Sequence, residues 1–259
     1  MVYNVETPAE ACERTVRSFL AEAENALKSE FEAAYMTGSA ADGDFHAGFS
    51  DLDFFFVLGR TLTETDFAKL NALYREHRRR ADGYYSALEG EIVSESALSD
   101  ARGTTVYWGT GGDRFRDRYT LSGFSMRAFL KRGVLLKGRD VRARLPYPTD
   151  EIIAEQSRNM IETVRKYARE AGEDAHFADW LFLLSQTVYT LKTGETVCKT
   201  RAAEWARAQV PLASLRSALD AALSIRFSPE RYTREIGRAL VLPIQEMADW
   251  AEKALEKAL

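Results

Sequence analysis

The sequence predicts an α/β domain over residues 1–148, with helices on a mixed sheet, followed by an all-α helical bundle over residues 149–259. Three observations support this fold class. Short apolar segments with strand character alternate with helical segments in the first part of the chain. Beyond about residue 150 the strand signals stop, and helical periodicity continues to the C-terminus. Between the two parts, residues 141–153 contain two of the six prolines and are predicted to be a linker.

The first helix is predicted over residues 8–30, where apolar residues follow helical spacing and a proline stands near the start. Three apolar segments then have strand character, at residues 31–38, 51–59 and 86–94. The segment 51–59 carries the strongest signal, because five apolar residues follow one another and three of them are aromatic. Its pattern is typical of a strand buried on both faces.

The remaining segments of the first domain are a helix over residues 63–80, which opens on Thr-Glu-Thr-Asp, and a helix with a short strand over residues 121–140. Residues 99–118 are rich in Gly, Asp and Arg and are predicted to be a loop. The helices expected in the second domain are amphipathic and cover residues 150–171, 176–193, 200–209, 211–225 and 229–258.

The composition bounds the class of protein. The chain has 259 residues, enough to bury a sizeable core, and a net charge of −4, which argues against a protein that holds long nucleic acid. No apolar run approaches the roughly 20 residues needed to cross a bilayer. The N-terminus lacks the basic region and apolar core of a signal peptide. We therefore expect a cytoplasmic monomer that binds neither nucleic acid nor a membrane.

The segment "GSAADGDFHAGFSDLDFFFV", residues 38–57, contains two carboxylates at the start of a buried strand. Asp51 and Asp53 are two residues apart, so their side chains share one face of the strand. Neighbouring carboxylates repel each other unless a cation compensates, and Mg²⁺ takes one or two carboxylates plus substrate phosphates. Upstream, the small residues Gly38 and Ser39 let backbone N–H groups approach an anion closely. The segment therefore predicts a phosphate-binding turn followed by a metal site.

This segment resembles the signature of the DNA polymerase beta-like nucleotidyltransferase superfamily, in which Gly-Ser precedes an Asp-x-Asp strand. Three further segments resemble the streptomycin/spectinomycin adenylyltransferases: "SALEGEIV", "KRGVLLKGRD" and "LLSQTVYTLKTGETVCKTRAAEWA". The resemblance implies an α/β nucleotidyltransferase domain followed by that family's helical C-terminal domain. It also implies ATP as co-substrate, Mg²⁺ as cofactor and transfer of AMP to a hydroxyl of an aminoglycoside antibiotic, with antibiotic resistance as the consequence.

The resemblance assigns roles to the residues that match its motifs. Asp51 and Asp53 would bind Mg²⁺, and Glu89 would be the third metal-binding carboxylate and the general base. The residues expected to contact the nucleotide are Gly38, Ser39, Ser50 and Lys199.

An aminoglycoside is a polycation, so its pocket would combine acidic side chains with aromatic walls. The candidates of these types are Trp108, Glu173, Asp174, Asp179 and Trp180. The chain departs from the related enzymes at Gln186, where they have an arginine, so one cation near the phosphates is absent at this position.

Two other functions stay open. One is nucleotidyl transfer to a different acceptor, such as a metabolite or a protein. The other is a nucleotide-binding regulator without turnover. The presence of all three acidic positions, Asp51, Asp53 and Glu89, favours an enzyme over the regulator.

Overall fold

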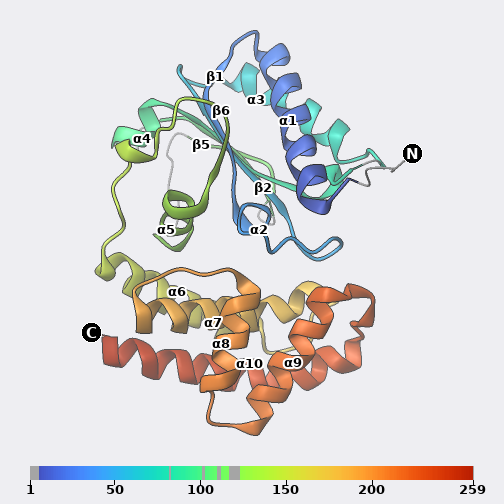
Figure 1. Cartoon of the computed structure of the whole chain (residues 1–259), viewed down its shortest axis with the longest axis vertical. Helices are drawn as coiled ribbons and strands as arrows, with labels where there is room; N and C mark the ends of the chain where they lie inside the picture. The colour runs from blue at the N-terminus through green and yellow to red at the C-terminus, as the bar shows by residue number, and fades with distance from the viewer. Residues whose placement is uncertain (1–5, 82, 101–102, 110–111, 117–122, 259) are drawn as a thin grey trace. The chain divides into compact units, whose positions relative to one another are not determined.

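The computed structural model describes residues 6–81, 83–100, 103–109, 112–116 and 123–258. The chain forms two compact units (Figure 1). The first unit contains a six-stranded mixed sheet with helices, and the described part of the second contains helices and no strand. This architecture confirms the predicted fold class. The first unit comprises Met1–Leu121 and Phe129–Tyr147, and the second comprises Ser122–Ala128 and Pro148–Leu259.

The strand order in the sheet is β5-β4-β3-β2-β1-β6. Neighbouring strands are antiparallel except for the central pair β2 and β3, which run parallel and in register. The strands span β1 Phe31–Met36, β2 Leu52–Leu58, β3 Leu88–Ser94, β4 Thr105–Trp108, β5 Arg114–Arg116 and β6 Val134–Gly138.

Two helices, α1 (Pro8–Leu27) and α3 (Glu64–His77), pack together over one face of the sheet (Figure 1). The core on this face is aromatic: the ring of Phe19 lies 5.1 Å from that of Phe54 and 6.2 Å from that of Trp108. Alternation along each strand sends the intervening side chains to the opposite face. The sheet therefore separates an apolar face from a second face on which polar side chains can gather.

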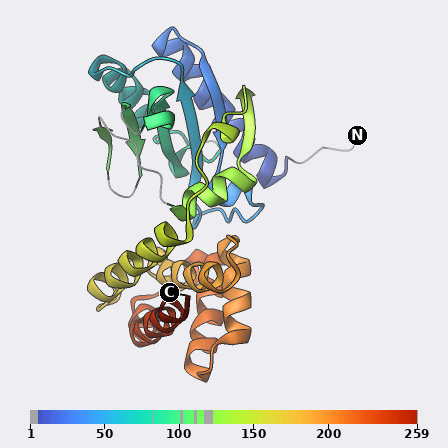
Figure 2. The same ribbon diagram turned by 90° about the vertical axis from the view of Figure 1, so that its left-hand side faces the viewer.

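The second unit is built from consecutive helices, which Figure 2 shows from the side. The end of α7 is fixed by Gly194, which adopts a left-handed conformation as the C-cap. The helices are α6 Asp150–Tyr167, α7 Asp179–Thr193, α8 Lys199–Gln209, α9 Ala213–Phe227 and α10 Arg234–Ala258. Helix α5, Gly123–Arg132, is divided between the two units, because its residues up to Ala128 belong to the second unit and the rest belong to the first. The shorter helical elements are α2 Gly38–Ala41, η1 Tyr85–Ala87, α4 Ser96–Asp100, η2 Arg142–Arg144, η3 Ala175–Ala178 and η4 Pro229–Arg231.

The predicted loop over residues 99–118 is wrong for the described part of that segment. It contains β4 and β5, which extend the sheet beyond β3 as an antiparallel pair. The sequence of β4, Thr-Val-Tyr-Trp, consists of β-branched and aromatic residues. The prediction failed because this short strand lies among Gly, Asp and Arg residues and is stabilised by its pairing with β3, a contact distant in the sequence.

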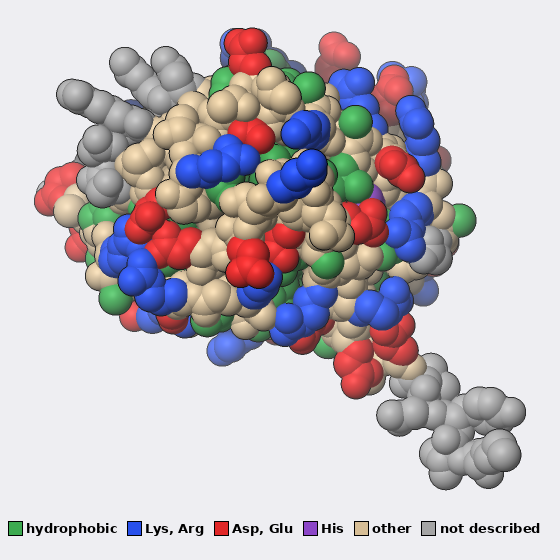
Figure 3. Space-filling view, turned by 90° about the horizontal axis from the view of Figure 1, so that it is seen from above, with side chains coloured by type: hydrophobic (Ala, Val, Ile, Leu, Met, Phe, Trp, Pro, Cys, Tyr) green, Lys and Arg blue, Asp and Glu red, His purple; other side chains and the backbone are tan. Residues whose placement is uncertain are grey.

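Charged side chains of both signs lie on the surface of the protein. Figure 3 shows acidic and basic side chains interspersed on one face of the molecule. Several form ion pairs, such as Lys137 with Glu24 at 2.8 Å and Arg144 with Glu95 at 2.6 Å. Within the described part of the chain, the helices are too short or too polar to span a membrane.

A buried carboxylate, Asp66, holds the start of α3. It accepts hydrogen bonds from the backbone N–H and the hydroxyl of Thr63 at 3.0 and 2.9 Å, and it pairs with Arg60 at 2.6 Å. The hydrogen bond from Arg60, followed by those from Thr63, outweighs burial and lowers the pKa of Asp66 to about 2. The ionised form of Asp66 is therefore part of the folded state.

We expect Asp66→Asn to reduce the free energy of unfolding by about 1–2 kcal/mol at neutral pH. Because the pKa is lower in the folded state, this contribution is present above the ordinary carboxyl pKa of about 4 and is lost as the pH falls towards 2. Chemical unfolding of wild type and variant over a pH series measures the difference. Glu64→Gln, an exposed carboxylate in the same helical turn, is the control. A difference that stays constant from pH 6 to pH 3 would contradict the assignment.

Candidate functional site

The parallel register of β2 and β3 brings two acidic side chains together. Asp53 is directly paired with Glu89, near the first residue of each strand. Neighbouring strands lie about 4.8 Å apart, so two paired residues project side by side from the same face. Gly90 follows Glu89, and a Cβ at this position would lie 2.2 Å from the carbonyl oxygen of Phe54. The absence of a side chain at Gly90 therefore lets β2 and β3 approach each other with the Phe54 ring packed against β3.

A tight turn before α2 places backbone against Asp53. Gly38 has a left-handed backbone, φ +61°, and a Cβ built on it would lie 2.0 Å from Asp53 Oδ2. The N–H of Thr37 donates a hydrogen bond of 2.9 Å to the Asp53 carbonyl, which fixes the turn to β2. The structure thus brings Gly38 and Asp53 together, and only glycine fits there without displacing the carboxylate.

The two serines of the same segment hold the loop between α2 and β2. The Ser39 hydroxyl donates to the Asp51 carbonyl at 3.3 Å, and the Ser50 hydroxyl accepts from the His46 N–H at 3.0 Å. Asp51 directly precedes β2 and is half-buried, like Asp53. Ser39 and Ser50 therefore position the residues on either side of the loop. Their predicted contacts with a triphosphate stay predictions.

The chemistry of the acidic side chains fits a magnesium ion. Asp51, Asp53 and Glu89 offer oxygen ligands, which Mg²⁺ prefers, and one or two carboxylates are enough when substrate phosphates complete the shell. In the described residues, however, no group of three or more His, Cys, Asp or Glu side chains is arranged to hold a metal ion. The role of Glu89 as a third ligand stays a prediction.

Two residues near this acidic pair were not predicted as part of the site. Glu91 lies on the same face of β3 as Glu89, and burial raises its pKa to about 7. Tyr107 on β4 is paired with Glu91. Burial, followed by the charges of Glu89 and Glu91, raises the pKa of Tyr107, and the charge of Asp53 adds to this effect. The alternation in Thr-Val-Tyr-Trp could have identified Tyr107, had the segment been recognised as a strand.

In the second unit the structure pairs Lys199, a predicted nucleotide contact, with Asp179, a predicted acceptor contact. Lys199 is the first residue of α8, and its ammonium lies 3.0 Å from Asp179 Oδ1 at the start of α7. Burial raises the pKa of Asp179, but the hydrogen bond from His176 and the charge of Lys199 outweigh it and lower that pKa. Each of the two side chains therefore already has a charged partner.

The other predicted acceptor contacts differ in exposure. Trp108 is a core residue: it is fully buried, its ring stacks on Tyr74 at 4.9 Å, and its indole N–H donates to Asn71. It cannot form the wall of a ligand pocket, contrary to the prediction, because the pairing of β4 with β3 turns it to the apolar face. Of the other candidates, all in the second unit, Glu173 and Asp174 are exposed and Trp180 is partly exposed.

Gln186 is a structural residue of the second unit. Its amide Nε2 donates a hydrogen bond of 2.7 Å to the Val197 carbonyl, which ties α7 to the segment before α8. Gln186 therefore supports the turn that precedes Lys199.

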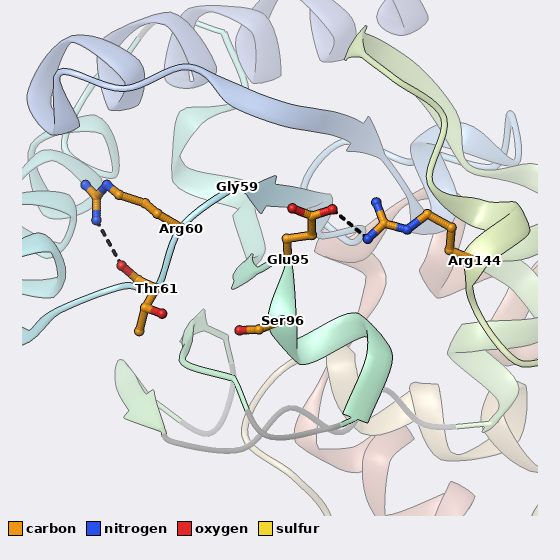
Figure 4. A pocket seen from close by; sticks show the side chains of 6 residues that line it. All are labelled: Gly59, Arg60, Thr61, Glu95, Ser96 and Arg144. Carbon is orange, nitrogen blue, oxygen red and sulfur yellow. Dashed lines mark hydrogen bonds and ion pairs between the residues drawn. The ribbon is translucent and has the colours of Figure 1, made fainter.

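A pocket of about 390 Å³ lies at the other end of the β2 and β3 pair, where Gly59 and Glu95 follow the two strands (Figure 4). Its two arginines already bind carboxylates: Arg144 pairs with Glu95 at 2.6 Å, and Arg60 pairs with Asp66 at 2.6 Å. Paired in this way, the arginines attract an anion only weakly. The end of the sheet at Asp53 and Glu89 is the stronger candidate site.

Gly38→Ala is expected to destabilise the first unit more than Gly43→Ala. Both glycines have left-handed backbone, with φ of +61° and +68°. Each alanine therefore costs about 1–2 kcal/mol on this account. A Cβ at Gly43 meets nothing within 4 Å, whereas one at Gly38 meets the Asp53 carboxylate. The extra loss in the free energy of unfolding, measured by urea denaturation, reports this contact.

The double variant Gly38→Ala/Asp53→Ala tests whether contact with Asp53 causes the extra loss of stability, because it removes the oxygen and carbon atoms closest to the new Cβ. It should recover about 1 kcal/mol relative to the sum of the single changes. Equal losses for Gly38→Ala and Gly43→Ala would show that Gly38 and Asp53 are not in contact.

Comparisons with known proteins identify a relative in structure. No protein-family model and no curated protein matches the chain. The structure is similar to that of spectinomycin adenyltransferase AAD(9) from Enterococcus faecialis with ATP and spectinomycin, with a TM-score of 0.66 and 15% sequence identity. The similarity covers 95% of this chain and 98% of that one. The chain therefore shares its fold with an aminoglycoside adenylyltransferase, as its motifs predict.

Proposed function

We propose that the protein is a Mg²⁺-dependent nucleotidyltransferase that moves AMP from ATP to a hydroxyl group of an aminoglycoside of the streptomycin or spectinomycin type. The observation that carries the proposal is the position of Asp53, which lies against Gly38 and beside Glu89. The fold shared with AAD(9), whose structure contains ATP and spectinomycin, supports it.

The residues around Asp53 would bind the nucleotide. The backbone of the turn at Gly38 and the hydroxyls of Ser39 and Ser50 would contact the triphosphate. Asp51 and Asp53, with Glu89, would hold Mg²⁺, which neutralises charge on the transferring phosphate. Lys199, in the second unit, is proposed as a further triphosphate contact on the basis of the motif around it.

Glu89 would act as the general base. The acceptor oxygen forms a bond to the α-phosphorus of ATP while the bond to the leaving pyrophosphate breaks, and the hydroxyl proton passes to the Glu89 carboxylate. A carboxylate with this role contributes about 10²- to 10⁴-fold to the rate. The protein contributes little covalent chemistry otherwise, because positioning and charge stabilisation dominate phosphoryl transfer.

For the acceptor, the proposed contacts in the second unit are Glu173, Asp174 and Trp180, which are exposed or partly exposed, with Asp179 beside Lys199. Their carboxylates would attract the ammonium groups of an aminoglycoside, and the indole would stack on a sugar face. Trp108 is not part of this proposal, because it is buried in the core of the first unit.

Pyrophosphate release from ATP and Mg²⁺, measured with a panel of aminoglycosides, spectinomycin and simple polyols, tests the function. The proposal requires a product that gains one AMP unit, seen by mass spectrometry. Transfer to another member of the panel alone would identify a different acceptor class. ATP binding without transfer to any of them would instead indicate a regulator.

Asp53→Asn is expected to weaken ATP binding at least about tenfold in the presence of Mg²⁺, because it removes a charge that the ion requires. Isothermal titration calorimetry with and without a chelator measures this effect. Asp66→Asn, which removes a carboxylate at the start of α3, is the control and should keep the Mg²⁺ dependence. ATP affinity that is insensitive to chelator in the wild type would exclude the metal assignment.

Glu89→Gln keeps the shape of the side chain and removes its basicity. We expect kcat to fall by about 10²-fold or more, while the KM for ATP changes little. Steady-state pyrophosphate release with the acceptor found in the panel provides the measurement, with Glu64→Gln as a control for loss of one carboxylate. Wild-type turnover in Glu89→Gln would place the base elsewhere.

A further inference from the structure

Two oxygen atoms from different strands meet above Gly109, at the end of β4. A Cβ built on Gly109 would lie 2.1 Å from the Tyr107 hydroxyl and 2.8 Å from Glu89 Oε2. Both atoms therefore occupy the space that a side chain at position 109 would fill, and they lie close to each other. The neighbouring residues of a strand point to opposite faces, so Tyr107 and Gly109 share a face and Trp108 does not.

The strand register explains why the two side chains meet. Gly90 is paired with Trp108, and Glu91 is paired with Tyr107, in the antiparallel contact of β3 with β4. Continuing the register by one residue places Gly109 across from Glu89. Tyr107 is then diagonal to Glu89, within reach of a long aromatic side chain when nothing stands between them. Glycine at 109 leaves that path open.

The phenolic hydroxyl of Tyr107 can donate a hydrogen bond, whereas an ionised carboxylate only accepts. The guanidinium of Arg116 on β5 lies 5.9 Å from the centre of the Tyr107 ring. A protonated hydroxyl next to a carboxylate is a donor to a charged acceptor, which gives a short and strong hydrogen bond.

We propose that Tyr107 is a positioning residue for Glu89: its hydroxyl donates to the Glu89 carboxylate in the nucleotide-bound protein and fixes the oxygen that accepts the proton from the acceptor. Gly109 is required because it leaves room for both groups. This inference rests on the proposed role of Glu89 as general base, and it assigns to β4 a part in the site that the motif segments do not contain.

Tyr107→Phe removes only the hydroxyl, and we expect kcat to fall about 10- to 100-fold with the KM for ATP unchanged, the loss of one hydrogen bond to a charged group. If Tyr107 acts through Glu89, the same change in a Glu89→Gln background should cause no further fall in kcat. Gly109→Ala, which places a methyl group between the two oxygens, should reproduce the loss. Pyrophosphate release with the acceptor identified above measures the wild type and the four variants, which are Tyr107→Phe, Glu89→Gln, their combination and Gly109→Ala.

Tyr74→Phe is the matched control for a structural role. The Tyr74 hydroxyl donates at 2.6 Å to the carbonyl of Leu88, on the same strand as Glu89 but from the apolar face. Its loss should lower the unfolding midpoint and leave kcat unchanged, whereas Tyr107→Phe should show the reverse pattern. Unchanged kcat in Tyr107→Phe, or an equal fall in kcat in both backgrounds, would overturn the proposal.

A crystal structure of the wild type with ATP and Mg²⁺ tests the contact without reference to activity. The proposal requires the Tyr107 hydroxyl within about 3 Å of a Glu89 oxygen and, in Tyr107→Phe, a second rotamer of Glu89. A separation beyond about 3.5 Å excludes the contact. If the wild type transfers AMP to no acceptor, the proposed function fails. The crystallographic distance then still decides whether Tyr107 holds Glu89.

Discussion

The parallel, in-register pairing of β2 with β3 is the constraint on which the candidate site depends. It places Asp53 beside Glu89 on one face and the Phe54 ring on the other. A shift of β2 by one residue would exchange the two faces and bury Asp53 among aromatic rings. An unpaired carboxylate in such a core costs several kcal/mol, so the aromatic packing against α1 holds the register that the acidic pair needs.

The polar residues of the two units are organised in different ways. In the first unit, Asp53 and Glu89 lie side by side on paired strands, and two neighbouring carboxylates favour a cation or a positively charged ligand. In the second unit, Lys199 and Asp179 neutralise each other at the starts of two helices. A bound metal ion would lower the electrostatic free energy of the Asp53 and Glu89 pair. Lys199, in contrast, would have to exchange the Asp179 carboxylate for a phosphate in order to bind one.

The sequence alone predicted those features that depend on local pattern. The apolar run that follows Asp53 predicted β2, and helical periodicity predicted the helices of the second unit within a few residues of their observed ends. It could not predict β4, because four residues give too short a pattern and their strand conformation depends on pairing with β3. The burial of Trp108 and the proximity of Tyr107 to Glu89 follow from that same pairing, so they were inaccessible to a reading of local pattern.

The close packing at Gly90 has a consequence for how such a protein can change. Gly90 stands between Glu89 and Glu91, and the space above it is filled by the carbonyl and ring of Phe54. Any larger residue there would force β2 and β3 apart and move the acidic pair with them. We therefore expect laboratory evolution towards a new acceptor to retain glycine at position 90 of β3. Arg114 and Arg116 on β5, at the edge of the sheet, are exposed and can vary without disturbing the register.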